Sequence, residues 1–297
     1  MTDDYIVDAH HHLWDLEVCK HTWLAEKGVI RFFGDPAPIQ KNYHATDLIA
    51  DIGTLPVRKS VHIQCGVAEE DAVAETMWID SQARSHEMPN AIVAFCDLTD
   101  QQRDAALDQH AKSPRFRGVR QIVGRSTEED RQTGTAALLE NPEFLSGLKR
   151  LAERGLSFDL QLTPPLMRAA AEVFGGVPEL NVALCHCGSP SDFTKNGTEE
   201  WQTGLRALAA LPNLICKVSG FGMFNHDWTT EGIRPHVLSV IDIFGPERVA
   251  FGSNFPVDRL HASYGEVMVA HINIVSSFSV REQRQMLAGT AERFYRI

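Results

Sequence analysis

The chain has 297 residues, of which 43% are hydrophobic and 23% charged, an ordinary composition for a globular protein. Its formal net charge is −11, from 28 Lys and Arg against 39 Asp and Glu. Such a surface repels phosphates and anionic lipids on average, so we expect a small-molecule partner and neither nucleic acid nor a membrane. No apolar run approaches the roughly 20 residues that cross a bilayer.

The N-terminus and the cysteines bear on the compartment. Met1–Asp4 is acidic and no apolar stretch follows a basic segment, so no signal peptide is expected. The cysteines are scattered, mostly in predicted strands, which is typical of buried thiols and predicts a cytoplasmic protein. Cys185-His186-Cys187 is reminiscent of a zinc knuckle, but alternate strand residues face opposite sides, so we expect the thiols to point away from His186.

Short apolar or β-branched runs alternate with amphipathic stretches. The runs are Tyr5–Ala9, Ser60–Gln64, Ala91–Cys96, Arg117–Ile122, Ser157–Leu162, Val182–His186, Leu214–Ser219 and Arg248–Gly252. The helical stretches are Glu69–His86, Pro142–Arg154, Leu166–Phe174, Glu200–Leu211 and Ile233–Phe244. Strand–helix alternation forces parallel pairing, and eight such units favour closure into a barrel. The predicted fold is α/β: a single (β/α)8 TIM-barrel domain over residues 1–297.

Two connections are longer than a barrel needs. His12–His44 follows the first predicted strand and Val123–Asn141 follows the fourth. Loops of this length usually cover a site, and the aromatic residues of the first, such as Trp23 and Phe33, predict a packed lid or pocket wall. No glycine-rich phosphate loop follows a strand, which disfavours a nucleotide site. Ser279–Ile297 is expected to be a C-terminal helix that closes onto the barrel.

Polar residues stand at most of the predicted strand ends, where a parallel barrel places its catalytic groups. His10 and His12 end the first strand on one face, and two imidazoles spaced in this way can chelate a divalent ion or bracket a carbonyl oxygen. Charge inside an apolar barrel is costly, so such residues are candidates for function. The other candidates are His62, Gln64, Arg120, Gln161, His186, Lys217, Ser219, Asn254 and Asp258.

Taken together, six motifs resemble those of the amidohydrolase superfamily, in its branch of sugar-lactone and 2-pyrone-4,6-dicarboxylate lactonases. They are Val7–Asp15, Ser60–Gln64, Arg117–Arg120, His186–Pro190, Lys217–Gly220 and Phe251–Val257, in the family's order over nearly the whole chain. The resemblance implies a TIM-barrel hydrolase that opens a lactone with activated water. It also implies that His10, His12 and His186 surround the reacting centre and hold one divalent metal, most simply zinc.

The chain departs from the family after the eighth strand. The family's metal-binding or basic Asp is replaced by Asn254, and an amide cannot accept a proton from water at neutral pH. Asp258, four residues on, is therefore the candidate base, with a histidine such as His62 as the alternative. Catalysis without a metal stays open, with the imidazoles and Lys217 polarising the carbonyl.

The remaining candidates concern the substrate. Arg120 and Lys217 on inward faces are expected to bind a carboxylate or several hydroxyls, with His62, Gln64 and Gln161 beside them. The alternative for Arg120 is an ion pair with Asp159. Asp8 is placed to accept a hydrogen bond from a metal-binding imidazole.

Two other functions are compatible with the same predicted fold. One is a non-oxidative decarboxylase, and the other is a catalytically inactive barrel kept for binding. The sequence leaves the oligomeric state open, a homo-oligomer included.

Overall fold

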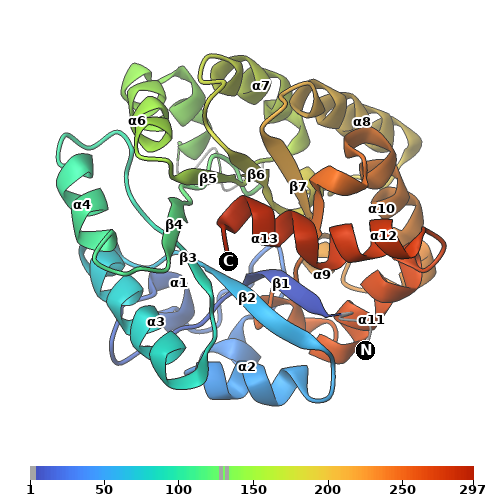
Figure 1. Ribbon diagram of the computed structural model, residues 1–297, viewed down its shortest axis with the longest axis horizontal. Coiled ribbons are helices and arrows are strands. Elements are labelled where there is room, and N and C mark those ends of the chain that lie inside the picture. The colour runs from blue at the N-terminus through green and yellow to red at the C-terminus, as the bar shows by residue number, and fades with distance from the viewer. Residues whose placement is uncertain (1–4, 127–129, 131–133) are drawn as a thin grey trace.

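The computed structural model describes residues 5–126, 130 and 134–297, and they form a ring of eight parallel strands surrounded by helices (Figure 1). The strands pair in chain order from β1 to β8. They are β1 Ile6–His11, β2 Val57–Ile63, β3 Ala91–Ala94, β4 Phe116–Val119, β5 Ser157–Leu160, β6 Val182–Leu184, β7 Leu214–Val218 and β8 Val249–Phe251. The predicted TIM-barrel fold is confirmed.

The ring closes between β8 and β1 at their carboxyl ends. The Asn254 N–H donates to the His10 carbonyl at 2.7 Å, and the His12 N–H donates to the Phe255 carbonyl at 2.7 Å. Gly252 permits this approach, since a Cβ there would lie 2.7 Å from the His10 nitrogen. Closure therefore brings Asn254 next to the histidines of β1.

Helices cover the outside of the ring (Figure 1). The longer ones are α2 Ala45–Ile52, α3 Ala72–His86, α4 Arg103–His110, α6 Pro142–Glu153, α7 Met167–Gly175, α8 Lys195–Ala209, α10 Thr230–Phe244 and α11 Tyr264–Val275. The shorter ones are α1 Thr22–Ala25, α9 Phe221–Phe224, α12 Val280–Arg284 and α13 Thr290–Tyr295. Within the described ranges, no helix has the length and apolar character to span a membrane.

The C-terminal segment closes one end of the barrel. After α12, a π-helical turn at Gln285–Gly289 leads into α13, which crosses the ring in Figure 1. Phe294 and Tyr295 pack there against inward residues of the strands, among them Val7 and Ala9. The predicted closing helix is confirmed, and the carboxyl ends of the strands are left to form the site.

The long connection between β1 and α2 packs as a lid, which we define as residues 12–44. Trp14 is fully buried, and its Nε1 donates to the Lys41 carbonyl at 2.7 Å. The second long connection, Val123–Asn141, includes residues 127–129 and 131–133, which lie outside the described part of the chain. All six cysteines are free thiols and buried, as the sequence predicted.

Candidate active site

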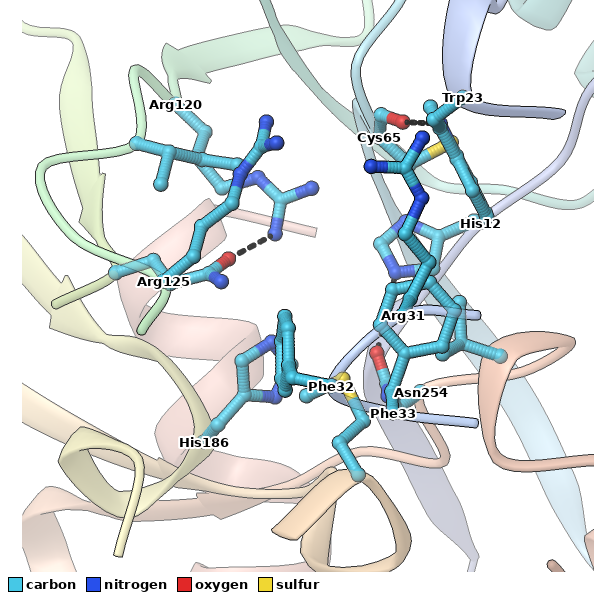
Figure 2. Close-up of a pocket in the computed structure, with 14 residues that line it drawn as sticks. His12, Trp23, Arg31, Phe32, Phe33, Cys65, Arg120, Arg125, His186 and Asn254 are labelled. Atoms are coloured by element: carbon cyan, nitrogen blue, oxygen red, sulfur yellow. Dashed lines mark hydrogen bonds between the residues drawn. The ribbon is translucent and has the colours of Figure 1, made fainter. Parts of the chain in front are cut away.

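A pocket opens at the carboxyl ends of the strands (Figure 2). Its walls combine aromatic side chains of the lid with arginines and imidazoles. Figure 2 shows Arg120 and Arg125, which follow β4, on one side and Arg31 of the lid on the other. The site's other main lining residues are His12, Trp23, Phe32, Phe33, Cys65, Gln161, His186 and Asn254.

Three predicted site histidines come together here. The ring centroids of His10 and His12 are 5.0 Å apart, and those of His10 and His186 are 4.5 Å apart. His186 lies beyond β6, which ends two residues earlier than predicted, in a turn where its φ is 53°. Gly220 leaves room for the ring, because a Cβ at that position would lie 2.6 Å from His186 Nδ1.

Backbone and hydroxyl groups orient two of these rings. His12 Nδ1 lies 2.6 Å from the Ile63 carbonyl, which can only accept, so Nδ1 carries the hydrogen and Nε2 offers a lone pair. His186 Nδ1 lies 2.9 Å from Ser219 Oγ. Burial lowers the pKa of both imidazoles well below the usual value, so they are neutral at neutral pH.

His10 is the unsatisfied member of the group. It is fully buried, yet neither of its ring nitrogens has a hydrogen-bond partner among the described residues. Burial is also the largest cause that lowers its pKa, with the positive charge of Lys217 adding to it. A buried polar group without a partner is rare and indicates a missing ion, water or substrate group.

The prediction for Asp8 is wrong. Its carboxylate accepts hydrogen bonds from the Ser253 N–H at 2.9 Å, the Ser253 hydroxyl at 2.6 Å and the Tyr264 hydroxyl at 3.0 Å. No imidazole donates to it in the described structure. Asp8 therefore links β8 to β1. The Ile63 carbonyl, and not Asp8, accepts the hydrogen bond from the His12 ring.

Asn254 stands between His12 and Asp258. Its Oδ1 lies 3.2 Å from His12 Nε2, and its Nδ2 donates to Asp258 Oδ1 at 3.1 Å. Asp258 is 2% exposed and is not part of the pocket lining. Burial raises its pKa to about 7, against the lowering effect of the Asn254 hydrogen bond. Asp258 therefore reaches the pocket only through the Asn254 amide, which cannot relay a proton.

The contact between His12 and Asn254 indicates whether the site could hold a cation. Nε2 and Oδ1 both present lone pairs, so they repel across 3.2 Å unless a positive group lies between them. A zinc ion bonded at about 2.0–2.2 Å holds neighbouring ligand atoms roughly this far apart. The donor set therefore fits a divalent metal. The ligand atoms of His10, His12 and His186 do not all lie within 4.8 Å of one another, so a shared ion would draw these rings closer.

Arg120 is held rigidly in the pocket wall. Its Nη1 donates to Gln161 Oε1 at 2.9 Å, its Nη2 donates to the Gln64 carbonyl, and Gln64 Nε2 donates back to the Arg120 carbonyl at 2.8 Å. No carboxylate in the described residues forms an ion pair with it, so the alternative pairing with Asp159 is wrong. A buried guanidinium without an anion is suited to an anionic ligand.

Lys217 does not line the pocket, as its predicted role in substrate binding would require. It is fully buried and forms an ion pair with Asp159, which also accepts from the Tyr295 hydroxyl at 2.9 Å. The inward face was predicted correctly, but the side chain lies deeper than the pocket, towards the end closed by α13. The substrate contact expected of Lys217 is therefore corrected to a structural ion pair.

His62 and Gln64 also lie behind the pocket wall. His62 is fully buried, and its Nδ1 accepts from the Leu13 N–H at 3.1 Å, so the neutral ring carries its hydrogen on Nε2. That ring cannot take a proton from water while it is neutral and bonded in this way. Gln64 supports Arg120 and does not line the pocket.

Sequence reasoning missed two pocket arginines. Arg31 and Arg125 stand outside the strands, in the lid and in the loop after β4, so strand-end position could not find them. The available signal was local: Arg31 precedes Phe32-Phe33 in an aromatic lid segment, and Arg125 follows Arg120 by five residues.

The fold and the family together define the class of protein, a TIM-barrel hydrolase. The chain belongs to the amidohydrolase family, which matches residues 7–297. It is 37% identical over 302 residues to the uncharacterized protein y4mH of Sinorhizobium fredii, with all of both chains covered. It is 26% identical over 269 residues to an L-fucono-1,5-lactonase of Burkholderia ambifaria, covering 88% of this chain and 83% of that one.

The fold recurs in a solved amidohydrolase of Burkholderia multivorans. Two crystal structures, one with bound HEPES and one with bound zinc, match with TM-scores of 0.84 and 0.83. Sequence identity is 23%, and each match covers 99% of this chain and 100% of that one. The family match, together with the lactonase relative, makes the chain a hydrolase of the amidohydrolase superfamily.

Proposed function

We propose that this chain hydrolyses a lactone that carries a carboxylate or several hydroxyl groups, with a carboxylated lactone preferred. The observation that carries the proposal is the buried Arg120 guanidinium, which lines the pocket without a carboxylate partner among the described residues, in a chain of net charge −11. Two further arginines line the same pocket: Arg125, and Arg31, which is paired with Glu26. Guanidinium groups match carboxylates bidentately. The lactonase name of the Burkholderia ambifaria relative supports the reaction type.

The substrate would lie between the arginines and the imidazoles. Arg120 is pre-positioned by Gln161 and Gln64, so it loses little side-chain entropy on binding a carboxylate. The aromatic residues Trp23, Phe32 and Phe33 exclude water from the opposite wall, which strengthens each electrostatic contact inside. This arrangement leaves the lactone carbonyl near His12, His186 and Asn254.

His10, His12 and His186 would hold one divalent cation, with the Asn254 amide oxygen as a further ligand. The unsatisfied His10 ring and the facing lone pairs of His12 and Asn254 support this donor set. Nitrogen ligands favour zinc, and the zinc-bound amidohydrolase of Burkholderia multivorans supports that choice. When bound, the cation polarises the carbonyl and lowers the pKa of water.

The reaction is addition of water to the lactone carbonyl carbon, followed by cleavage of the ring C–O bond. The alkoxide takes up a proton, and the product is a hydroxy acid. Neutral His10 and His186 would stabilise the developing oxyanion as donors or hold the ion that does so, whereas His12 presents a lone pair and would only hold the ion. Neither Asp258 nor His62 takes the water's proton directly, because Asn254 screens the first, and the second already accepts the Leu13 N–H through Nδ1 and carries its hydrogen on Nε2.

A lactone panel tests the proposal. The full-length protein is assayed for acid release against matched lactones with and without a carboxylate, with zinc supplied and then removed by a chelator. We expect turnover, with a higher kcat/KM for the carboxylated member of each pair. Carbon dioxide is measured in the same reactions: its release without acid production would identify a decarboxylase, and binding without either product an inactive barrel.

A further inference from the structure

Three side chains with different metal-binding atoms meet behind the aromatic wall of the pocket. They are His21 in the lid, Cys65 just after β2 and Glu75 in α3. A ring nitrogen, the thiol sulfur and a carboxylate oxygen all lie within 4.8 Å of one another. Across the described ranges, no other group of three or more His, Cys, Asp and Glu side chains is this close.

These side chains lack the partners that buried polar groups need. His21 is 2% exposed and Glu75 is 1% exposed, and neither ring nitrogen of His21 nor Oε1 of Glu75 has a hydrogen-bond partner. His21 Nε2 and Glu75 Oε1 are 3.9 Å apart, too far for a hydrogen bond. A buried carboxylate with no donor is costly, and a cation between the two groups would remove that cost.

The environment suits ligation by the imidazole. Burial lowers the pKa of His21 to about 4, so the ring is neutral and has a lone pair to give. Burial also raises the pKa of Glu75 to about 8 and, together with the negative charge of Glu75, raises that of the Cys65 thiol; the positive charge of Arg120 opposes both shifts without cancelling them. A divalent cation favours the anionic form of both groups.

We propose that His21, Cys65 and Glu75 form a second metal site, separate from the His10, His12 and His186 centre, that binds zinc or a similar borderline divalent cation. Nitrogen, sulfur and oxygen donors together select such a cation over Mg²⁺ or Ca²⁺, which take oxygen ligands. On binding, the Cys65 thiol loses its proton to solvent, as does Glu75 where it is protonated. Three protein ligands leave a fourth position for water.

The site has an entry path and a structural consequence. His21 lines a surface hollow next to Lys20 and Asp71, and Cys65 lines the active-site pocket, so the cluster lies between two openings. The Cys65 carbonyl accepts from Trp23 Nε1 at 2.5 Å. A cation here would tie the lid to β2 and α3 and would fix the residue that holds Trp23 in the pocket wall.

Cobalt titration of the chelator-treated full-length protein tests the proposal. Co²⁺ bound to a thiolate absorbs in the near ultraviolet by sulfur-to-cobalt charge transfer, and the His10, His12 and His186 centre contains no sulfur. We expect this absorption in the parent, its loss in Cys65→Ser, and its retention in His12→Gln. Cys19→Ser is the matched control, because Cys19 is a buried thiol of the lid, two residues from His21, that lies outside the cluster.

A second variant guards against misfolding of Cys65→Ser. Glu75→Gln should keep the charge-transfer absorption but weaken cobalt binding by about tenfold or more, because a neutral amide replaces an anionic ligand. Far-ultraviolet circular dichroism verifies that each variant is folded. The proposal is overturned if the parent shows no sulfur-to-cobalt absorption, if Cys65→Ser keeps it, or if Glu75→Gln binds cobalt as tightly as the parent. None of these outcomes depends on lactone turnover.

Discussion

At the scale of single residues, Asn254 is the position on which the site's chemistry depends. Its backbone lies in the left-handed region, with φ of 56°, which Asn tolerates better than most residues. From there the amide faces His12 with its oxygen and Asp258 with its nitrogen. An Asp at position 254 would place two carboxylates in contact, so Asn254 lets Asp258 stay buried without a second negative charge beside it.

This geometry predicts unequal effects of two substitutions. Asn254→Ala removes the group that faces His12 and should abolish most activity. Asp258→Asn keeps an oxygen that can accept from Asn254, so we expect a loss of only about fivefold, the value of roughly one hydrogen bond. Steady-state kinetics on a lactone that the parent accepts provides the measurement. A loss of about 10²–10⁴-fold in kcat for Asp258→Asn would instead mark Asp258 as the general base.

Arg120 carries the prediction for substrate charge. Arg120→Met should raise KM for a carboxylated lactone by about 10- to 100-fold, since a lost hydrogen bond to a charged group costs about 1.5–3 kcal/mol. KM for the matched neutral lactone should change less. Arg154→Met is the control, because Arg154 pairs with Asp104 and Asp108 outside the pocket. Unchanged KM values on every accepted lactone would contradict the assignment.

The sequence predicted which side chains point inward better than how deep they lie. Period-two alternation placed Arg120 and Lys217 on inward faces, and both are buried. His10 is buried among the site histidines although Val7 and Ala9 also point inward, because the pairing of β1 is irregular between Asp8 and His11. Alternation cannot distinguish a residue at the carboxyl end of the barrel from one at mid-height, because a residue's depth in the barrel depends on strand register and tilt. Lys217 was therefore expected at the substrate, whereas it pairs with Asp159 below it.

At the scale of elements, the eight strands and most of the long helices were predicted, whereas α2, α4 and the apolar α11 were not. The α4 sequence, Arg103–His110, is mostly polar and buries only Leu107 and His110, so its apolar pattern is too sparse to recognise. The α8 helix begins at Lys195, earlier than its apolar residues suggested, because the Thr194 side chain caps it by accepting from the Gly197 N–H.

Contacts between elements also explain why β7 carries a buried lysine, Lys217. Lys217 of β7, Asp159 of β5 and Tyr295 of α13 form one connected polar group inside the apolar end of the barrel. Such a group is strongly stabilising only while it is complete, because each charge depends on its partner for compensation. It fixes α13 against two strands that are far apart in the sequence.

Removing only one charge of the Lys217–Asp159 pair should therefore lower the free energy of unfolding more than removing both charges. Lys217→Met leaves the Asp159 carboxylate uncompensated and should lower the free energy of unfolding by about 3–5 kcal/mol. The double variant Lys217→Met, Asp159→Leu should recover part of that loss. Urea unfolding of the two single variants and the double variant measures the coupling. KM should stay near the parent value in folded Lys217→Met; a raised KM with unchanged stability would restore the substrate role.

At the scale of the whole molecule, the lid and the barrel share one core. Trp14, Leu24 and Tyr43 of the lid belong to the same apolar cluster as Tyr264 and Met268 of α11. The backbone bonds that close the ring also join the start of the lid, at His12, to the end of β8. A barrel that lacks any strand has open edges, so the folded parts stabilise one another.

This sharing predicts that the 297 residues unfold as one domain. Urea unfolding followed by far-ultraviolet circular dichroism and by tryptophan fluorescence should give coincident transitions, because lid and barrel lose the same contacts together. Fluorescence is a sensitive probe here, since Trp14 and Trp23 both lie in the lid among five tryptophans in the chain. Zinc must be held at one concentration throughout, because a bound ligand shifts the midpoint. A fluorescence change at urea concentrations that leave the dichroism intact would mean that the lid melts separately, and the chain would then comprise two units.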